Sequence, residues 1–168
     1  LEQVLVRLGR RTAPSAVLLG GYAGTWARWA DVARLPVDEP AVRRAGLTLG
    51  AGVVVPLADE ACGVRVTADL LAYLASMSAR QCGPCLYGLP AIAQHWAALA
   101  DGDADRRTVN RLRGDVSAVE GRGACRHPDG ATRLSTSALE VFGAHLAAHQ
   151  SGLRCRYRGR MTLPGATR

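Results

Sequence analysis

Residues 64–100, VRVTADLLAYLASMSARQCGPCLYGLPAIAQHWAALA, contain two apolar helical patterns on either side of the pair Cys82 and Cys85. Before this pair, apolar residues recur every three or four positions, the spacing that places them on one face of a helix: Val66, Leu70, Leu71, Leu74 and Met77. We predict that this helix stops near Ser78. Pro84 suits the first turn of a second helix, where a missing N–H costs little. The second helix is expected to bury Leu86, Leu89, Ile92, Ala93, Trp96, Leu99 and Ala100.

Two more helices are expected downstream. Asp103 or Asp105 can cap a third helix whose apolar positions are Val109, Leu112, Val116 and Val119. Ser137 and Glu140 have the spacing of a capping box and predict the start of a fourth helix through Leu139, Phe142 and Leu146. Residues 61–150 are therefore predicted to form a small four-helix bundle.

Residues 1–60 have a different pattern, with short apolar runs separated by glycine and proline. We predict strands at 4–8, 16–19, 47–49 and 53–55, with a tight hairpin at Gly50-Ala51-Gly52 because glycine supplies the positive φ of such turns. Gly20-Gly21-Tyr22-Ala23-Gly24 lacks the spacing of a phosphate-binding loop and is interpreted as a structural turn. The predicted fold class is α+β, with a small β domain before the helical bundle.

Composition and charge exclude several classes of protein. The chain has 168 residues, 48% of them hydrophobic, and its net charge of +7 comes mostly from five Arg in residues 151–168, a segment without acids. The remainder carries 16 Arg against 14 acids, so we expect no nucleic-acid partner and interpret the Arg-rich end as a disordered tail. No apolar run approaches the roughly 20 residues of a membrane span, and no secretory signal is visible. Five cysteines, an odd number, favour a reducing, cytoplasmic location and cysteines kept for chemistry.

Three of these cysteines are candidate metal ligands. Cys82 and Cys85 form a CxxC pair at a predicted helix start, where backbone N–H groups stabilise thiolates, and Cys125 follows the third helix. We expect the three thiols to converge at one end of the bundle. The CxxC spacing is shared by zinc sites, thiol-disulfide switches and iron-sulfur sites, so it does not choose among them.

The surrounding sequence resembles one family. SMSARQCGPCLYG at 76–88, followed by VEGRGAC at 119–125, resembles the iron-sulfur region of the NADH-binding flavoprotein subunit of respiratory NADH:quinone oxidoreductase, which reads ESCGQCxPCREG and then IEGRTxC. Residues 45–55, AGLTLGAGVVV, resemble the AGSxLGSGAVIV segment that closes the family's ubiquitin-like soluble-ligand-binding β domain, and Gly20-Gly21 matches its double-glycine turn. The resemblance covers about residues 15–150. It implies an iron-sulfur electron-transfer module similar to the C-terminal half of that subunit, with Cys82, Cys85 and Cys125 as cluster ligands.

This sequence departs from the family pattern in two places. Ala79 stands where the family has the first cysteine of CxxCxxC, and Leu86-Tyr87 replaces Arg-Glu. Three thiolates remain, so we expect either a 4Fe-4S cluster with a substitute or non-protein fourth ligand, or a 3Fe-4S cluster. His127 is the better candidate for a fourth ligand and Ser78 the other.

Other residues are not expected to bind the cluster. Cys62 lies about 24 Å away if residues 63–78 are helical, and it is interpreted as a buried or helix-start thiol. Cys155 is interpreted as a free thiol. His95, His145 and His149 are interpreted as packing or helix-surface residues.

The resemblance also bears on partners. The family's NADH and flavin sites lie in a domain that precedes the β domain, so we expect no FMN or NAD site here and no NADH oxidation by this chain alone. The expected partner is a flavin- and NADH-binding domain or another redox subunit. Two alternatives remain open. One is a non-redox binding or scaffold module in which Cys82, Cys85 and Cys125 hold nothing, or hold zinc together with His127, and the other is a CxxC thiol-disulfide switch.

Overall fold

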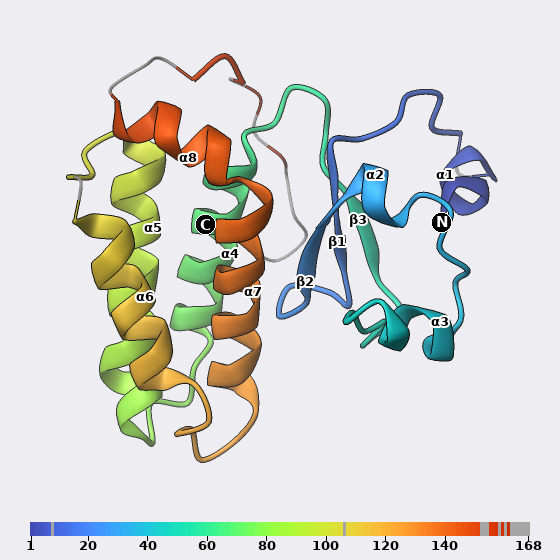
Figure 1. The fold of residues 1–168 in the computed structure, drawn as a ribbon. Coiled ribbons are helices and arrows are strands. Elements are labelled where there is room, and N and C mark those ends of the chain that lie inside the picture. Colours follow the sequence, from blue (N-terminus) through green and yellow to red (C-terminus); the bar gives the residue numbers. More distant parts are fainter. Residues whose placement is uncertain (8, 106, 152–154, 158, 160, 162–168) are drawn as a thin grey trace.

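The computed structural model describes residues 1–7, 9–105, 107–151, 155–157, 159 and 161. These residues form an α+β fold with eight α-helices, one short π-helix and a three-stranded antiparallel sheet in the order β2-β1-β3 (Figure 1). The sheet consists of β1 (Ala16–Leu19), β2 (Thr25–Arg28) and β3 (Val54–Pro56), and it is accompanied by the short helices α1 (Glu2–Arg7), α2 (Trp29–Val32) and α3 (Glu39–Arg44). The helical part that follows consists of α4 (Gly63–Ser76), the π-helix η1 (Pro84–Gly88), α5 (Leu89–Asp101), α6 (Thr108–Val119), α7 (His127–Val141) and α8 (Gly143–Gln150).

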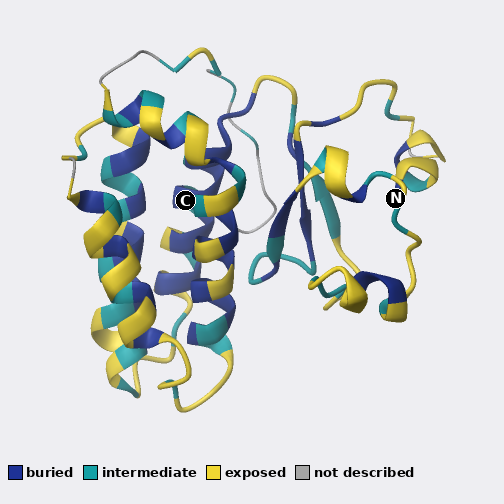
Figure 2. Ribbon diagram, viewed as in Figure 1, coloured by how far each residue is buried: buried dark blue, intermediate teal, exposed yellow. Residues whose placement is uncertain are grey.

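The helices pack in sequence order. Helix α4 packs against α5, α5 against α6, α6 against α7, and α7 returns to α4, while α8 lies across one end (Figure 1). Their buried residues face one another and form one core (Figure 2). None of the helices in the described part of the chain has the length and apolar composition needed to cross a membrane.

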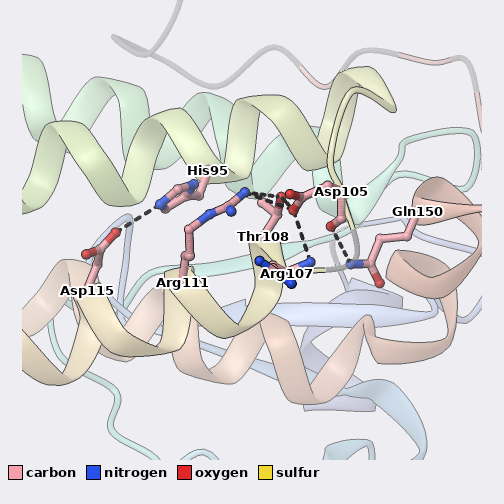
Figure 3. Close-up of polar contacts among 7 residues, drawn as sticks. All are labelled: His95, Asp105, Arg107, Thr108, Arg111, Asp115 and Gln150. Carbon is pink, nitrogen blue, oxygen red and sulfur yellow. Dashed lines mark hydrogen bonds and ion pairs between the residues drawn. The ribbon is translucent and has the colours of Figure 1, made fainter.

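Local signals account for several helix ends. The Cys62 thiol accepts a hydrogen bond from the backbone N–H of Arg65 and so caps α4. Gly102 adopts a left-handed conformation, φ 82°, where α5 ends. The start of α6 is held by Asp105, whose carboxylate accepts hydrogen bonds from the Arg107 backbone N–H and the Thr108 hydroxyl (Figure 3).

The same close-up shows how α6 is joined to its neighbours. Arg111 forms an ion pair with Asp105, and His95 of α5 lies 3.0 Å from Asp115 of α6 (Figure 3). The Gln150 side chain, at the end of α8, donates to the Asp105 carbonyl at 3.4 Å (Figure 3). Asp105, one of the two predicted caps, thus holds the start of α6, although the residue directly before the helix is Arg107.

Strand β1 joins the two parts of the molecule. It is buried along its whole length and lies between β2 and β3. Ala16 and Leu18 belong to the same core as the helices, whereas Val17 and Leu19 belong to a second core under α2. The alternation of side chains along a strand thus places one face of the sheet against the helical part.

Several sequence predictions agree with these elements. The first helix starts directly after Cys62 and ends at Ser76, close to the predicted stop. Leu89, Ile92, Ala93, Trp96, Leu99 and Ala100 form the buried face of α5 as predicted. The prediction also places Leu86 on that buried face, but its side chain is exposed.

Three predicted elements are wrong. The predicted strand at 4–8 lies in helix α1, because Leu1 and Leu5 point to the core at helical spacing; residue 8 is outside the described set. Residues 47–49 form no strand. The turn at 50–52 is present, and the Gly52 N–H donates to the Leu49 carbonyl there. The predicted hairpin between 47–49 and 53–55 does not form, because β3 pairs with β1. A Cβ on Gly50 would lie 2.9 Å from the Gly20 carbonyl oxygen, so the turn at 50–52 packs directly on the turn that contains Gly20.

The third error concerns the last predicted helix. Ser137 does not start a helix, because α7 runs without a break from His127 to Val141. The Ser137 hydroxyl is buried, donates to the Leu134 carbonyl and accepts from the Trp26 backbone N–H. A residue that looks like a helix cap therefore serves as a link between α7 and β2. The predicted disordered tail falls partly outside the described residues, and within them Cys155, Tyr157 and Met161 pack against the helical core.

Gly88 provides a test of the packing that joins η1 to α6. A Cβ at this position would fall well inside van der Waals contact with Val119, whose branched side chain is buried and has little freedom to move. We expect Gly88→Ala to lower the free energy of unfolding by about 1–3 kcal/mol in denaturant titrations. Gly114→Ala is the matched control, because nothing lies within 4 Å of its Cβ position on the exposed face of α6. This variant should raise the free energy of unfolding by about 0.5–1 kcal/mol. A neutral or stabilising Gly88→Ala would contradict the tight contact.

Candidate metal centre

Cys82, Cys85 and Cys125 lie on two chain connections at the same end of the helices. Cys85 is in η1, Cys82 precedes it, and Cys125 is in the turn between α6 and α7. Both connections are at the end of the helices opposite α8 (Figure 1). The Cys82 carbonyl accepts a hydrogen bond from the Leu86 N–H at 2.9 Å, so this cysteine begins the first turn of the helix.

Backbone N–H groups point at two of the sulfur atoms. Hydrogen bonds from the backbone of Ala124 and of Cys85 lower the pKa of the Cys82 thiol. Cys85 is only 3% exposed, and burial, followed by the neighbouring Cys82, raises the pKa of its thiol. A backbone hydrogen bond from Arg80 has the opposite effect and lowers the pKa of the Cys85 thiol. The site thus supplies the donors that a thiolate pair requires.

The position of Arg80 is conformationally unusual. Its φ of 55° lies in the left-handed region, and it is the one residue other than glycine with a positive φ in the described part of the chain. This conformation is costly for a residue with a Cβ, yet here it turns the backbone N–H toward the Cys85 sulfur. Backbone strain is therefore placed where it positions a donor for a candidate ligand.

Cys125 approaches the pair from the other connection. Its charge contributes to the raised pKa of Cys85, and the backbone of its neighbour Ala124 donates to Cys82, so the connection that carries Cys125 lies beside the CxxC pair. The Gly121 N–H donates to the Asp129 carboxylate at 2.8 Å, and Arg126 pairs with the same carboxylate. The hydrogen bond from Gly121 is the largest cause that lowers the pKa of Asp129, and the contact with Arg126 is the next. Both contacts hold the loop against the first turn of α7.

The two predicted substitute ligands already have hydrogen-bond partners. The Ser78 hydroxyl donates to the Ala75 carbonyl at 2.9 Å and lies 3.4 Å from the Cys85 carbonyl. His127 begins α7, and its Nε2 lies 2.9 Å from the carbonyl oxygen of Leu74. Ala79, in the position of the missing cysteine, is exposed in the connection after α4.

A second group of possible ligands lies at the other end of the helices. Cys62, His145, His149 and Cys155 place one donor atom each within 4.8 Å of one another. Cys62 is buried at the start of α4, as predicted, but Cys155 and the two histidines lie together with it, which the sequence interpretation did not foresee. The spacing His145-x3-His149, with Cys155 six residues later, is a signal that could have suggested a metal site.

Comparison with known proteins assigns the helical part. The family described as the NADH-ubiquinone oxidoreductase-F iron-sulfur binding region matches residues 65–149, half of the chain. The chain belongs to this iron-sulfur binding family. The match includes Cys82, Cys85 and Cys125, and it ends before Cys155 and begins after Cys62. This membership confirms the family inferred from the sequence motifs and the iron-sulfur class of cofactor.

Individual relatives agree with the family assignment. A subunit of the NADH-quinone oxidoreductase of Streptomyces coelicolor is 24% identical over 123 residues, which cover 73% of this chain and 27% of that protein. The fold is similar to a chain of an NAD+-reducing [NiFe]-hydrogenase in the H2-reduced state, with a TM-score of 0.79, 22% identity, and coverage of 92% of this chain and 25% of the other. The air-oxidized state of such a hydrogenase gives a TM-score of 0.73, with 21% identity over 92% of this chain and 26% of the other. The chain thus spans about a quarter of the length of these relatives.

The opposite pKa shifts of the two neighbouring thiols predict different reactivities in metal-free protein. Because its pKa is lowered, Cys82 should form thiolate and react with iodoacetamide at a lower pH than Cys85, whose thiol is buried. Mass spectrometry of alkylated peptides across a pH series measures both rates. Cys62 is the internal control: burial raises its pKa to about 11, so it should be labelled slowly. Faster labelling of Cys85 than of Cys82 would contradict the hydrogen-bond arrangement.

Proposed function

We propose that this member of the iron-sulfur binding family holds a cluster through Cys82, Cys85 and Cys125 and acts as an electron-transfer module. The observation that carries the proposal is that backbone N–H groups, one of them from Ala124 beside Cys125, reach the sulfur atoms of Cys82 and Cys85. Such N–H groups offset the negative charge of cluster thiolates and are one of the ways in which a protein sets a reduction potential. An iron-sulfur cluster, when bound, accepts and releases single electrons.

The fit of the donor set supports this function. Burial, followed by the neighbouring Cys82 and then by the charge of Cys125, raises the pKa of the Cys85 thiol, so a thiolate at Cys85 is costly in the metal-free protein. Binding of positive iron ions to the sulfur atoms would remove this penalty. Thiolate is the ligand type that iron-sulfur clusters use. Cys85 is buried, Cys82 is half-buried and Cys125 is exposed, so the site has one protected and one open side.

The missing fourth cysteine gives two versions of the cofactor. Three thiolates suffice for a 3Fe-4S cluster, whereas a 4Fe-4S cluster would take a fourth ligand from Ser78 or His127. For Ser78 this requires the hydroxyl to leave the Ala75 carbonyl. For His127 it requires ligation through Nδ1, or release of Nε2 from the Leu74 carbonyl oxygen.

The open side is proposed as the place where a redox partner docks. Met77, Leu86 and Tyr87 flank the cysteines in sequence and are exposed by 61%, 42% and 72% of their surface. Exposed apolar side chains beside a redox site favour contact with another protein surface. The partner that the family resemblance implies is a flavin- and NADH-binding domain or another redox subunit, and a cytoplasmic location is proposed for the complex.

The domain organisation is proposed on the same basis. Residues 1–60 correspond to the soluble-ligand-binding β domain with its ubiquitin-like fold, and residues 61–150 to the helical iron-sulfur domain. The cyclic packing of α4, α5, α6 and α7 supports a four-helix bundle as the core of the second domain.

Metal analysis of single-cysteine variants tests the ligand set. We expect Cys82→Ala, Cys85→Ala and Cys125→Ala each to lose most of the iron found in the anaerobically purified protein, because each removes one of only three thiolates. Cys62→Ser and Cys155→Ser are the matched controls and should keep it, since both thiols lie at the other end of α4. Full iron content in Cys125→Ala would refute the site. Zinc in place of iron at these three cysteines would support the non-redox scaffold instead.

Position 79 tests the consequence of the missing cysteine. An iron without a thiolate ligand is the one most easily lost on oxidation, so we expect the cluster to lose iron in air. Ala79→Cys, in an exposed position near Cys82, should slow this loss, whereas Ala79→Ser should not. The iron-to-protein ratio and the electron paramagnetic resonance spectrum after a fixed exposure to air measure the difference. Equal loss in both variants would show that another group already fills the position.

A further inference from the structure

A closed group of two cysteines and two histidines lies at the α8 end of the helices, away from the three-cysteine site. Cys62 caps the start of α4, His145 and His149 are one helical turn apart on α8, and Cys155 follows α8. We propose that these four residues bind one Zn²⁺ ion, as a structural site that clasps the C-terminal segment to the first long helix.

The distances between the donor atoms suit a single ion. Cys62 Sγ lies 3.5 Å from His149 Nε2 and 3.9 Å from His145 Nε2, and Cys155 Sγ lies 3.1 Å from His145 Nε2. Tetrahedral zinc, with bonds of about 2.0–2.3 Å, holds its ligand atoms about 3.3–3.8 Å apart. In an iron-sulfur cluster the ligands bind different irons, so their donor atoms spread farther than the 4.8 Å seen here.

The ligand types also suit zinc. Zinc takes neutral imidazole nitrogens and thiolate sulfurs as ligands, and Cys62 and His149 are buried at this site. When Zn²⁺ binds, the two thiol protons leave to solvent, and the two thiolates balance the charge of the ion. Cys2His2 is a set that structural zinc sites use.

The surroundings hold the ligands in place. The His149 ring hydrogen-bonds with the backbone of Leu99 and Ala100, while its Nε2 faces Cys62, and such a bond orients a metal-binding imidazole. His145 packs against the Tyr157 ring, with 5.3 Å between the centroids. Farther along, the Gly159 N–H donates to the Glu60 carbonyl at 2.8 Å, next to the start of α4. The segment that carries Cys155 is thus anchored beyond the ligand as well.

The test measures zinc and iron together in the full chain. We expect about one zinc per chain in the purified protein and at least a roughly tenfold loss in Cys155→Ser and in His149→Ala, with iron unchanged. Cys62→Ser is a useful third variant, because serine is itself a good helix cap and preserves the start of α4. Cys82→Ser is the reverse control and should lose iron but keep zinc, which separates this site from the proposed cluster.

Cobalt provides a second readout that needs no variant. Co²⁺ added to protein stripped with a chelator should bind with about one equivalent and give the intense visible absorption of a tetrahedral thiolate site. The absorption should be absent in Cys155→Ser and present in Cys82→Ser. Absence of both zinc and cobalt binding in the unmodified protein would overturn the proposal, as would a Cys62–Cys155 disulfide in its intact mass. Loss of zinc in Cys82→Ser with retention in Cys155→Ser would place the ion at the other site and refute the assignment.

Discussion

Helix α4 is the element on which both sites depend. Nine of its 14 residues are buried, and it packs against α5 on one side and α7 on the other. Burial of each large aliphatic side chain contributes about 1.5–3 kcal/mol, so this packing is a large part of the stability of the helical core. Because a helix rises 1.5 Å per residue, α4 is also a rigid spacer of about 20 Å. Its first residue follows Cys62 and its end leads to Cys82, which keeps the two cysteine sites apart.

The chemistry of the three-cysteine site comes mainly from the backbone. The groups that reach Cys82 and Cys85 are N–H groups of Ala124, Cys85 and Arg80, rather than charged side chains. Such donors are fixed by the chain path, so the site depends on the left-handed turn at Arg80 and on the contact between Gly88 and Val119. Through the contact between Gly88 and Val119, the end of α6 packs against the helix that carries the CxxC pair, and the loop of Cys125 follows directly.

The two ends of the helical part serve different purposes in this interpretation. At one end, an exposed cysteine and exposed apolar side chains leave a redox site open to a partner. At the other end, Cys62 and His149 are buried, and the chain closes over them with Cys155 and Tyr157. An electron-transfer site needs access to its partner, whereas a structural metal site is closed by its own protein ligands.

The sequence by itself determined the features that depend on neighbouring residues. The apolar spacing predicted α4 and most of the buried face of α5, Asp103 or Asp105 marked the region where α6 starts, and the CxxC and VEGRGAC motifs identified the family. Tertiary structure decided the rest, because long-range contacts override local signals. The Ser137 hydroxyl accepts a hydrogen bond from the Trp26 backbone instead of capping a helix. Strand β3 pairs with β1 and not with the residues 47–49 that precede it in sequence. The meeting of Cys62 with Cys155 depends on the path of five α-helices and η1 between them, and no local pattern contains that path.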